Sequence, residues 1–258
     1  MKNHFFISYF GNKRCECETI YESIKDKLDD IEFIVEPFCG SSAFSYFLSL
    51  KHPKKFKYIL NDNNKHLIEC YKIFSDESKL LNFIETLNEF CENIDKEKYL
   101  KIINIDDSLN WFLKHKLYKI RPGLFPNDYD TNKSNKFELL SKAPIINFIR
   151  SENITFINSE GVDVFNTYKN NENAFIFLDP PYLQTANSMY LESNMNIYEY
   201  FLYNHIADMK AKIMLVVEDN WLIRYLFNKL IIKEYSKTYF NHKHNKTTHL
   251  IIYNSKAI

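Results

Sequence analysis

The sequence predicts an α/β protein built on one mostly parallel sheet with helices on both faces. Short apolar runs alternate with amphipathic segments in the first and last thirds of the chain, which is typical of parallel strands joined by crossover helices. Two late runs rich in β-branched and aromatic residues predict a C-terminal antiparallel hairpin. The 258 residues suit one such core carrying an insertion, because single cores stop growing at about 250 to 300 residues.

The expected elements follow one another in a regular order. Short apolar runs predict the strands, and longer stretches with helical periodicity predict the helices between them. Residues 33–36, 58–61, 154–158, 174–178 and 212–217 are the expected parallel strands, 43–50, 64–74, 197–211 and 221–229 the helices, and 233–240 and 247–253 the hairpin strands.

Residues 75–153 interrupt this alternation and indicate an insertion between two parts of one sheet domain, 1–74 and 154–258. Amphipathic stretches at 80–92 and 109–117 predict helices, and an irregular segment rich in Pro, Asn and Asp follows them. We therefore expect the insertion to be largely helical.

Charge is balanced over the chain but not within the insertion. The formal net charge is zero, with 33 basic and 33 acidic residues, so the total does not indicate a nucleic-acid partner. Between residues 110 and 150, eight basic residues face three acidic ones, a local net charge of +5. A solvated lysine-rich face and a nucleic-acid surface both fit this segregation.

Cysteine usage and hydropathy exclude some classes of protein. The five cysteines form no CxxC pair, and their odd number argues against a disulfide framework. No apolar run approaches the roughly 20 residues that span a bilayer, and the first ten residues do not resemble a signal peptide. We expect a globular, cytoplasmic protein without a membrane segment.

Two loops at strand ends are candidates for a cofactor site. The heptapeptide from Glu36 to Ser42 (EPFCGSS) lies where doubly wound folds place a tight turn and a helix N-terminus against a ligand. Asp62 comes just after the second strand, where an acidic side chain commonly binds a ribose diol. Taken alone, the first loop also fits an ordinary turn, and Asp62 an Asx turn or helix N-cap.

The apolar run 174–178 ends abruptly in the tetrapeptide Asp179-Pro180-Pro181-Tyr182. An amine on a planar base is a poor nucleophile because its lone pair is delocalised, and acceptors for its hydrogens can push it toward tetrahedral geometry. Asp179 and the Pro180 carbonyl would be those acceptors, and Tyr182 would stack on a base flipped out of the duplex. A Pro-Pro turn closing a strand is the alternative for these residues alone.

Four segments occur in the order found in one enzyme family. The hexapeptide from Tyr9 to Arg14 (YFGNKR) precedes the Glu36 loop, Leu60 to Asn64 and the Asp179 tetrapeptide. Together they resemble the Dam-like, alpha-group adenine-N6 DNA methyltransferases. The resemblance implies a Rossmann-like class I methyltransferase fold whose insertion is the target-recognition region.

The resemblance also implies a reaction and a set of contacts. A methyl group would pass from S-adenosyl-L-methionine to the N6 amine of a flipped-out adenine, leaving S-adenosyl-L-homocysteine. An acidic residue expected before the catalytic strand is ambiguous between Glu160 and Asp163, with Asp163 slightly favoured. The implied cofactor-binding residues are Tyr9, Phe10, Lys13, Glu36, Pro37, Phe38, Gly40, Ser41, Ser42, Asp62, Asn63, Asp163 and Asp179, and the implied catalytic residues are Asp179, Pro180, Pro181 and Tyr182.

The chain departs from the family at Gly40-Ser41-Ser42, where the family commonly carries more glycine. The Cβ atom of serine disfavours positive φ angles, which are open to glycine. We therefore expect the serines to narrow the pocket for the methionine part of the cofactor.

Contacts with DNA are expected in the basic part of the insertion. Lys114, Lys116, Lys119 and Arg121 interleave with apolar and aromatic residues, which suits phosphate neutralisation beside a flipped base. We expect double-stranded DNA as the partner and a monomer or weak dimer, and the sequence leaves open a cognate restriction endonuclease. No metal site is expected, because the histidines of the late polar stretch have no carboxylate or cysteine in register.

Other functions remain open from the sequence alone. The tetrapeptide would also serve methylation of cytosine N4 or of an amine in RNA. A cofactor-free DNA-binding or scaffold subunit derived from a methyltransferase would keep the fold, with the loop serines as a mark of decay. A dehydrogenase ranks far below both, because the Gly40 loop lacks the GxGxxG spacing.

Overall fold

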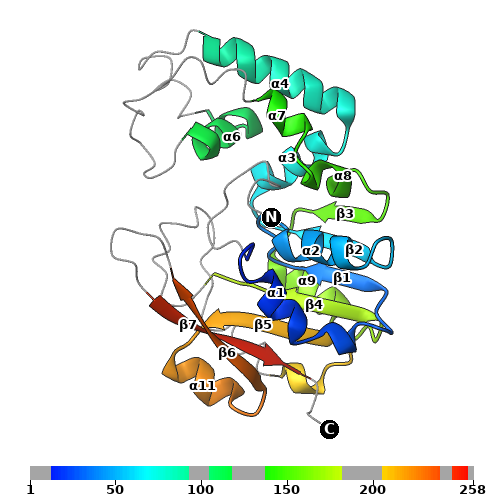
Figure 1. Ribbon diagram of the computed structural model, residues 1–258, viewed down its shortest axis with the longest axis vertical. Coiled ribbons are helices and arrows are strands. Elements are labelled where there is room, and N and C mark those ends of the chain that lie inside the picture. The colour runs from blue at the N-terminus through cyan, green and yellow to red at the C-terminus, as the bar shows by residue number, and fades with distance from the viewer. Residues whose placement is uncertain (1–12, 93–104, 118–136, 182–204, 239–245, 255–258) are drawn as a thin grey trace.

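The computed structural model describes residues 13–92, 105–117, 137–181, 205–238 and 246–254 (Figure 1). Within these ranges one central sheet runs through the molecule. Its strands are β1 (Phe33–Glu36), β2 (Lys57–Asn61), β3 (Ile154–Ile157), β4 (Ala174–Leu178), β5 (Lys212–Glu218), β6 (Ile231–Thr238) and β7 (Lys246–Tyr253).

The strands of this sheet lie in the order β3-β2-β1-β4-β5-β7-β6. β1 to β5 pair in parallel, whereas β7 pairs antiparallel with both β5 and β6. The predicted α/β fold, with a mostly parallel sheet and a C-terminal antiparallel hairpin, is therefore confirmed. It is consistent with the Rossmann-like arrangement that the family resemblance implied.

Helices cover both faces of the sheet and extend beyond one of its edges (Figure 1). Those of the insertion lie beyond the β3 edge (Figure 1), α1 precedes the first strand, and the remaining helices follow strands along the chain. The described helices are α1 (Cys17–Glu22), α2 (Ala43–Lys51), α3 (Lys65–Phe74), α4 (Glu77–Glu92), α6 (Ser108–Leu117), α7 (Glu138–Ser141), α8 (Ile145–Ile149), α9 (Gly161–Tyr168) and α11 (Trp221–Phe227).

Two hydrophobic clusters fill the space on either side of the sheet. In β4, Phe175 and Phe177 belong to the cluster that contains α2 and α3, whereas Ile176 and Leu178 belong to the one that contains α9 and α11. Successive strand residues point to opposite faces, so a strand covered on both sides is apolar throughout. This explains the unbroken apolar run at 174–178.

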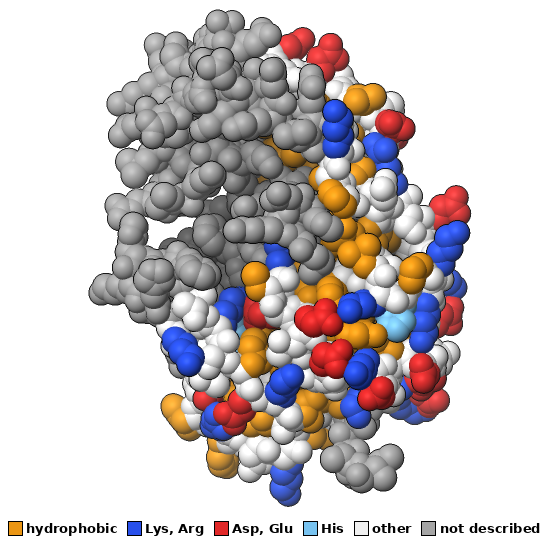
Figure 2. Space-filling view, viewed as in Figure 1, with side chains coloured by type: hydrophobic (Ala, Val, Ile, Leu, Met, Phe, Trp, Pro, Cys, Tyr) orange, Lys and Arg blue, Asp and Glu red, His pale blue; other side chains and the backbone are white. Residues whose placement is uncertain are grey.

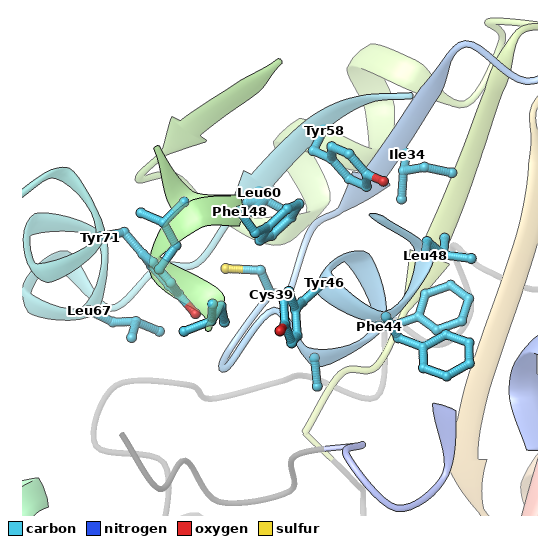
Figure 3. Close-up of a cluster of buried hydrophobic side chains, with 14 of the residues drawn as sticks. Ile34, Cys39, Phe44, Tyr46, Leu48, Tyr58, Leu60, Leu67, Tyr71 and Phe148 are labelled. Carbon is cyan, nitrogen blue, oxygen red and sulfur yellow. The ribbon is translucent and has the colours of Figure 1, made fainter. Parts of the chain in front are cut away.

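Aromatic side chains dominate the cluster around α2 (Figure 3). The ring centroids of Phe44 and Phe177 lie 4.4 Å apart, and those of Tyr58 and Phe148 lie 5.0 Å apart in an edge-to-face pair. Cys39, in the loop after β1, is buried in the same cluster. Its burial anchors that loop against the core.

The described part of the insertion is helical, as predicted, and continues the core of the sheet domain. α4 and α6 pack on α3, where the rings of Phe74, Phe83 and Phe112 form edge-to-face pairs with centroids 5.5 to 5.7 Å apart. At the surface of this contact, the Nε2 atom of His66 lies 2.7 Å from the Oδ1 atom of Asp106. The domain boundaries at 75 and 153 stay a prediction.

The helix predicted at 197–211 is wrong in its last part. Ile206–Asp208 forms only a short 3₁₀ turn, and Met209 is already extended toward β5, while 197–204 lie outside the described residues. The side-chain amide of Asn254 donates to the carbonyls of Ile206 and Ala211, at 2.9 and 2.8 Å. These hydrogen bonds hold a non-helical connection that no local pattern indicates.

Several short helices were not predicted from the sequence. α1, α8 and α9 have at most eight residues each, so their periodicity is too brief to recognise. α9 follows β3 and completes the crossover from β3 to β4. Two parallel strands require such a connection, but the sequence did not show where its helix lies.

Basic and acidic side chains are interspersed over the described surface around α1 and the sheet, as Figure 2 illustrates. This mixture agrees with the formal net charge of zero. Among the helices that the structure describes, none has both the length and the apolar character needed to cross a membrane.

Candidate active site

The loops after β1 and β4 meet at one edge of the sheet. These two strands are parallel neighbours, with Val35 opposite Ile176, and the chain proceeds from them in opposite directions across the sheet. In doubly wound folds such a switch point leaves a crevice at the carboxyl ends of the strands, where ligands bind. The loop residues from Glu36 to Ser42 and the Asp179 tetrapeptide both begin there.

The loop after β1 turns sharply through two residues with positive φ angles. Gly40 has φ 45° and Ser42 has φ 50°, both in the left-handed region. Glycine adopts this region freely, whereas serine meets steric strain there. Ser42 therefore adopts, with steric strain, a backbone conformation that suits glycine better. It is the N-cap residue of α2.

Asp62 fixes this turn from the neighbouring loop. Its Oδ2 atom accepts a hydrogen bond from the backbone N–H of Gly40, and its Oδ1 atom accepts one from Asn64, both at 3.0 Å. The second bond is the Asx turn that the sequence left open, and Asn64, in turn, caps α3 by accepting from the N–H of Leu67. Asn63 follows Asp62 in this turn and is half-buried.

Glu36 lies beneath the loop at the start of α2. Its Oε1 atom accepts hydrogen bonds from the backbone N–H of Ser45, at 2.8 Å, and from the Ser45 hydroxyl. The carboxyl group is 2% exposed, and this burial raises its pKa to about 7. Glu36 thus supports the loop and the helix N-terminus from below, and a direct cofactor contact stays a prediction.

Lys13 and Asp179 form an ion pair across the switch point. The Nζ atom of Lys13 lies 2.6 Å from each carboxylate oxygen of Asp179. Lys13 is 3% exposed and Asp179 16% exposed, so solvent screens the pair weakly. Burial raises the pKa of Asp179, and the ammonium of Lys13 opposes that rise.

The loop after β3 also joins the site, through Asn61. The side chain of Asn61 donates to the carbonyls of Pro37 and Ser159, at 2.8 and 3.0 Å, and accepts from the N–H of Ser159 at 3.0 Å. Asn158 donates to the Asp62 carbonyl at 2.8 Å. These amides join the loops after β1, β2 and β3, a role that the sequence did not reveal because asparagine at the end of a strand is common in turns.

Both acidic candidates before β4 lie at the beginning of α9. Glu160 is the N-cap residue and Asp163 lies in the first turn, and both side chains are exposed. Between them, Gly161 supports the ring of Phe38. A Cβ atom on Gly161 would lie 2.5 Å from the Cε1 and Cζ atoms of Phe38, so only glycine allows this contact.

Other predicted site residues fall partly outside the described chain. Pro180 is buried and Pro181 half-buried beside Asp179, and Ser41 is buried in the loop after β1. Lys114 and Lys116 belong to α6, although their side chains lie outside the description. Tyr9, Phe10, Lys119, Arg121 and Tyr182 also lie outside the described residues.

A metal centre has no support among the residues that the structure describes, since no cluster of three or more His, Cys, Asp or Glu side chains there is placed to hold an ion. The site consists instead of a glycine turn, a carboxylate beside it and a buried ion pair. This set is suited to binding a nucleoside and to accepting hydrogen bonds from an amine.

The model of the D12 class N6 adenine-specific DNA methyltransferases matches residues 9–243, which is most of the chain. The chain belongs to this family. The methyltransferase acts on adenine N6 in DNA, so the resemblance inferred from the four motifs is confirmed. The family assignment does not support the alternatives of cytosine N4 and dehydrogenation.

The methyltransferase is also similar to a protein of Paramecium bursaria Chlorella virus NC1A. That protein is named the type II methyltransferase M.CviBI, and it is 25% identical to this chain over 268 residues. The similarity covers 96% of this chain and 98% of the viral protein. It therefore includes the insertion as well as both parts of the sheet domain.

Proposed function

We propose that the methyl donor is S-adenosyl-L-methionine and that Asp179 and the Pro180 carbonyl hold the N6 amine of the target adenine. The observation that carries this proposal is the ion pair between Lys13 and Asp179 next to the Gly40 turn. A family that methylates DNA needs a methyl donor, and this edge of the sheet combines a nucleoside-type pocket with an acceptor for the amine.

The residues around the Gly40 turn fit the donor. The carboxylate of Asp62 lies beside the Gly40 turn, where its oxygens accept backbone hydrogen bonds, and it is the acceptor that we propose for a ribose hydroxyl. Phe38 offers an apolar surface, and the N-terminus of α2 favours the carboxylate of the amino-acid end. When bound, S-adenosyl-L-methionine supplies a methyl group on positively charged sulfur.

Asp179 is the stronger acceptor for the target amine when it is ionised, because hydrogen bonds to a carboxylate are charge-assisted. Two carboxylate oxygens provide about four acceptor positions, so Lys13 and the amine can share the group. While the amine accepts the methyl group, Asp179 and the Pro180 carbonyl would hold its two hydrogens, and the carboxylate of Asp179 could take up the proton that the methylated amine loses. Tyr182, expected to stack on the flipped base, would fix the ring plane.

The inserted region, 75–153, is proposed to recognise the DNA target. Lys114, Lys116, Lys119 and Arg121 would neutralise phosphates, because each is basic and lies in the segment with local net charge +5. Replacing Lys116, Lys119 and Arg121 by Gln should reduce the slope of log K against log salt by about 0.9 per lost phosphate contact. An unchanged slope would place the DNA surface elsewhere.

A role in restriction and modification follows from the viral relative's printed name. We propose that this chain protects a specific DNA sequence by methylation in the cytoplasm of a bacterial, phage or viral system, and that a restriction endonuclease of the same specificity accompanies it. The type II name belongs to the relative, and its similarity over nearly the full length supports the proposal.

Calorimetric titration tests the donor. The protein should bind S-adenosyl-L-methionine and S-adenosyl-L-homocysteine in a saturable manner, and NAD⁺ serves as the control nucleotide that should not bind. A protein that binds duplex DNA but neither adenosyl compound would instead be the scaffold subunit that the sequence left open. That result would overturn the proposed cofactor site.

A further inference from the structure

A buried polar cluster surrounds the side chain of Glu16, three residues after Lys13. The reaction proposed above gives this cluster no role. The carboxylate of Glu16 accepts hydrogen bonds from the hydroxyl of Tyr235, at 2.5 Å, and from the ammonium of Lys237. The Nδ1 atom of His249 lies 3.4 Å from Glu16 Oε2. Glu16 is 5% exposed and His249 fully buried, so this carboxylate is enclosed by the C-terminal hairpin.

Alternate residues of β6 face this cluster, because successive side chains of a strand point to opposite faces. Lys233, Tyr235 and Lys237 are half-buried and point to the face that contacts α1, where Lys233 donates to the carbonyl of Thr19. The residues between them are exposed, and Glu234 pairs with Arg224 on the opposite face. The start of α1 is thus hydrogen-bonded to one face of β6.

Glu16 is linked to Lys13 through the backbone. The N–H groups of Glu16 and Cys17 donate to the carbonyl of Lys13, at 2.8 and 3.0 Å, and the thiol of Cys17 donates to the same oxygen. Cys17 is fully buried and begins α1. These bonds fix the main chain of Lys13 to the same residues whose side chains contact the hairpin.

Charge links the two residues as well. Burial alone would raise the pKa of Glu16, but the hydrogen bond with His249 and the charges of Lys13 and Lys237 lower it to about 2. Glu16 is therefore an anion at neutral pH. Its charge lies between two lysines, and one of these, Lys13, pairs with Asp179 on its other side.

We propose that Glu16, held by Tyr235, Lys237 and His249, is a positioning residue that fixes Lys13 against the catalytic carboxylate of Asp179. This inference rests on the roles proposed above for Lys13 and Asp179. Without the Glu16 charge, Lys13 and Lys237 repel each other across a weakly screened interior, and the ammonium is free to leave Asp179. The C-terminal hairpin thereby supports the active site from a distance in sequence.

A double-mutant cycle tests this role. Glu16→Gln keeps the shape of the side chain but removes its charge, and it should lower the single-turnover rate of methyl transfer about tenfold, since charge-assisted hydrogen bonds are the strong ones. The affinity for the cofactor and for DNA should change less than about threefold. In a Lys13→Met background, the same change should lower the rate by less than about twofold, because its effect passes through Lys13.

Two further variants complete the design. Glu234→Gln removes a carboxylate from the same strand on the opposite face and should leave the rate unchanged. Tyr235→Phe removes one donor to Glu16 and should show the same dependence on Lys13 with a smaller loss, so it replaces Glu16→Gln if that variant does not fold.

Each outcome decides the inference. A wild-type rate in Glu16→Gln, or an equal loss with and without Lys13, would overturn it, because a purely structural contribution adds independently. If Asp179→Asn and Lys13→Met both keep the wild-type rate, the proposed function fails instead. Loss of activity in those two variants with a normal Glu16→Gln enzyme overturns only the positioning role.

Discussion

The Nζ atom of Lys13 lies 2.6 Å from both carboxylate oxygens of Asp179, although the two residues are 166 positions apart in the chain. The pair joins the segment before α1 to the end of β4. It places a positive charge beside a largely buried acid and so favours the ionised form, which accepts the stronger hydrogen bonds from an amine.

Replacing Lys13 by Met should shift the pH dependence of catalysis. Burial raises the pKa of Asp179 and Lys13 opposes this, so removing Lys13 raises the pKa further and leaves more of the acid protonated. The acidic limb of the kcat profile should therefore move to higher pH, and the variant should lose most of its rate below the limb. Methyl-transfer rates measured from pH 5 to 9 provide the comparison.

Lys210→Met is the matched control for this shift. Lys210 also pairs with a carboxylate, Glu172 at 2.8 Å, but both side chains are more than 60% exposed. Such surface pairs contribute little, so the profile should keep its wild-type position. A profile that does not move in Lys13→Met either would show that Lys13 has no influence on Asp179.

Asp62→Asn should weaken cofactor binding and destabilise the fold. Both Asp62 oxygens accept backbone hydrogen bonds, and an amide offers one oxygen while its NH₂ group faces the other N–H. One partly buried donor then loses its partner, which costs about 1 kcal/mol, at the low end for an unsatisfied group. Calorimetry and thermal unfolding measure the two effects.

Asp76→Asn separates these two effects. Asp76 also accepts from a backbone N–H near a helix start, that of Lys79 at 3.1 Å, but it lies at the surface beside α4. This variant should lose some stability and keep its affinity for the cofactor. Equal cofactor affinities of Asp62→Asn and wild type would argue against the ribose contact.

Gly161→Ala should reduce cofactor affinity by displacing Phe38. The added Cβ would lie 2.5 Å from two ring atoms, well inside van der Waals contact, so the ring must move. We expect an increase of about tenfold in the dissociation constant, comparable with the cost of modest overpacking. In a Phe38→Leu background the effect should largely disappear, and an undiminished effect there would exclude Phe38 as the cause.

Glu36→Gln should change how stability depends on pH. The folded-state pKa of about 7 exceeds the ordinary value of 4.5, so the folded protein holds one extra proton between these values and loses stability as pH rises through them. Gln keeps an acceptor for Ser45 without a titrating charge. Between pH 4.5 and pH 7, the free energy of unfolding of the wild type should therefore fall by roughly 3 kcal/mol more than that of the variant. If the free energies of unfolding of the wild type and the variant change equally with pH, the raised pKa of Glu36 is contradicted.

The parallel strands and the loops after them were predictable because their signals are local. The apolar run 174–178 is buried on both faces, and the tetrapeptide after it interrupts the strand with two prolines. Gly40 and Asp62 follow strands that the topology makes neighbours. The position of each residue at the end of a strand therefore predicts that it lies at the carboxyl edge of the sheet.

The Glu16 cluster was not predictable in the same way. Tyr235 lies 219 positions from Glu16, and a buried carboxylate has no local signature in sequence. The pattern around Lys233, Tyr235 and Lys237 indicated a strand, but it did not indicate that this face of the strand contacts Glu16. The missed turn at Ile206 has a similar cause, because its hydrogen-bond partner, Asn254, comes 48 residues later.

The central claim is that the ionised carboxylate of Asp179 accepts a charge-assisted hydrogen bond, which an uncharged amide cannot replace, from the amine that becomes methylated. Wild-type protein and Asp179→Asn would be incubated with labelled S-adenosyl-L-methionine and duplex DNA, and the digested nucleosides identified by mass spectrometry. We predict labelled N6-methyladenine with wild type and its loss with Asp179→Asn, while calorimetry shows that both bind DNA. N6-methyladenine formed by Asp179→Asn at the wild-type rate would contradict the claim.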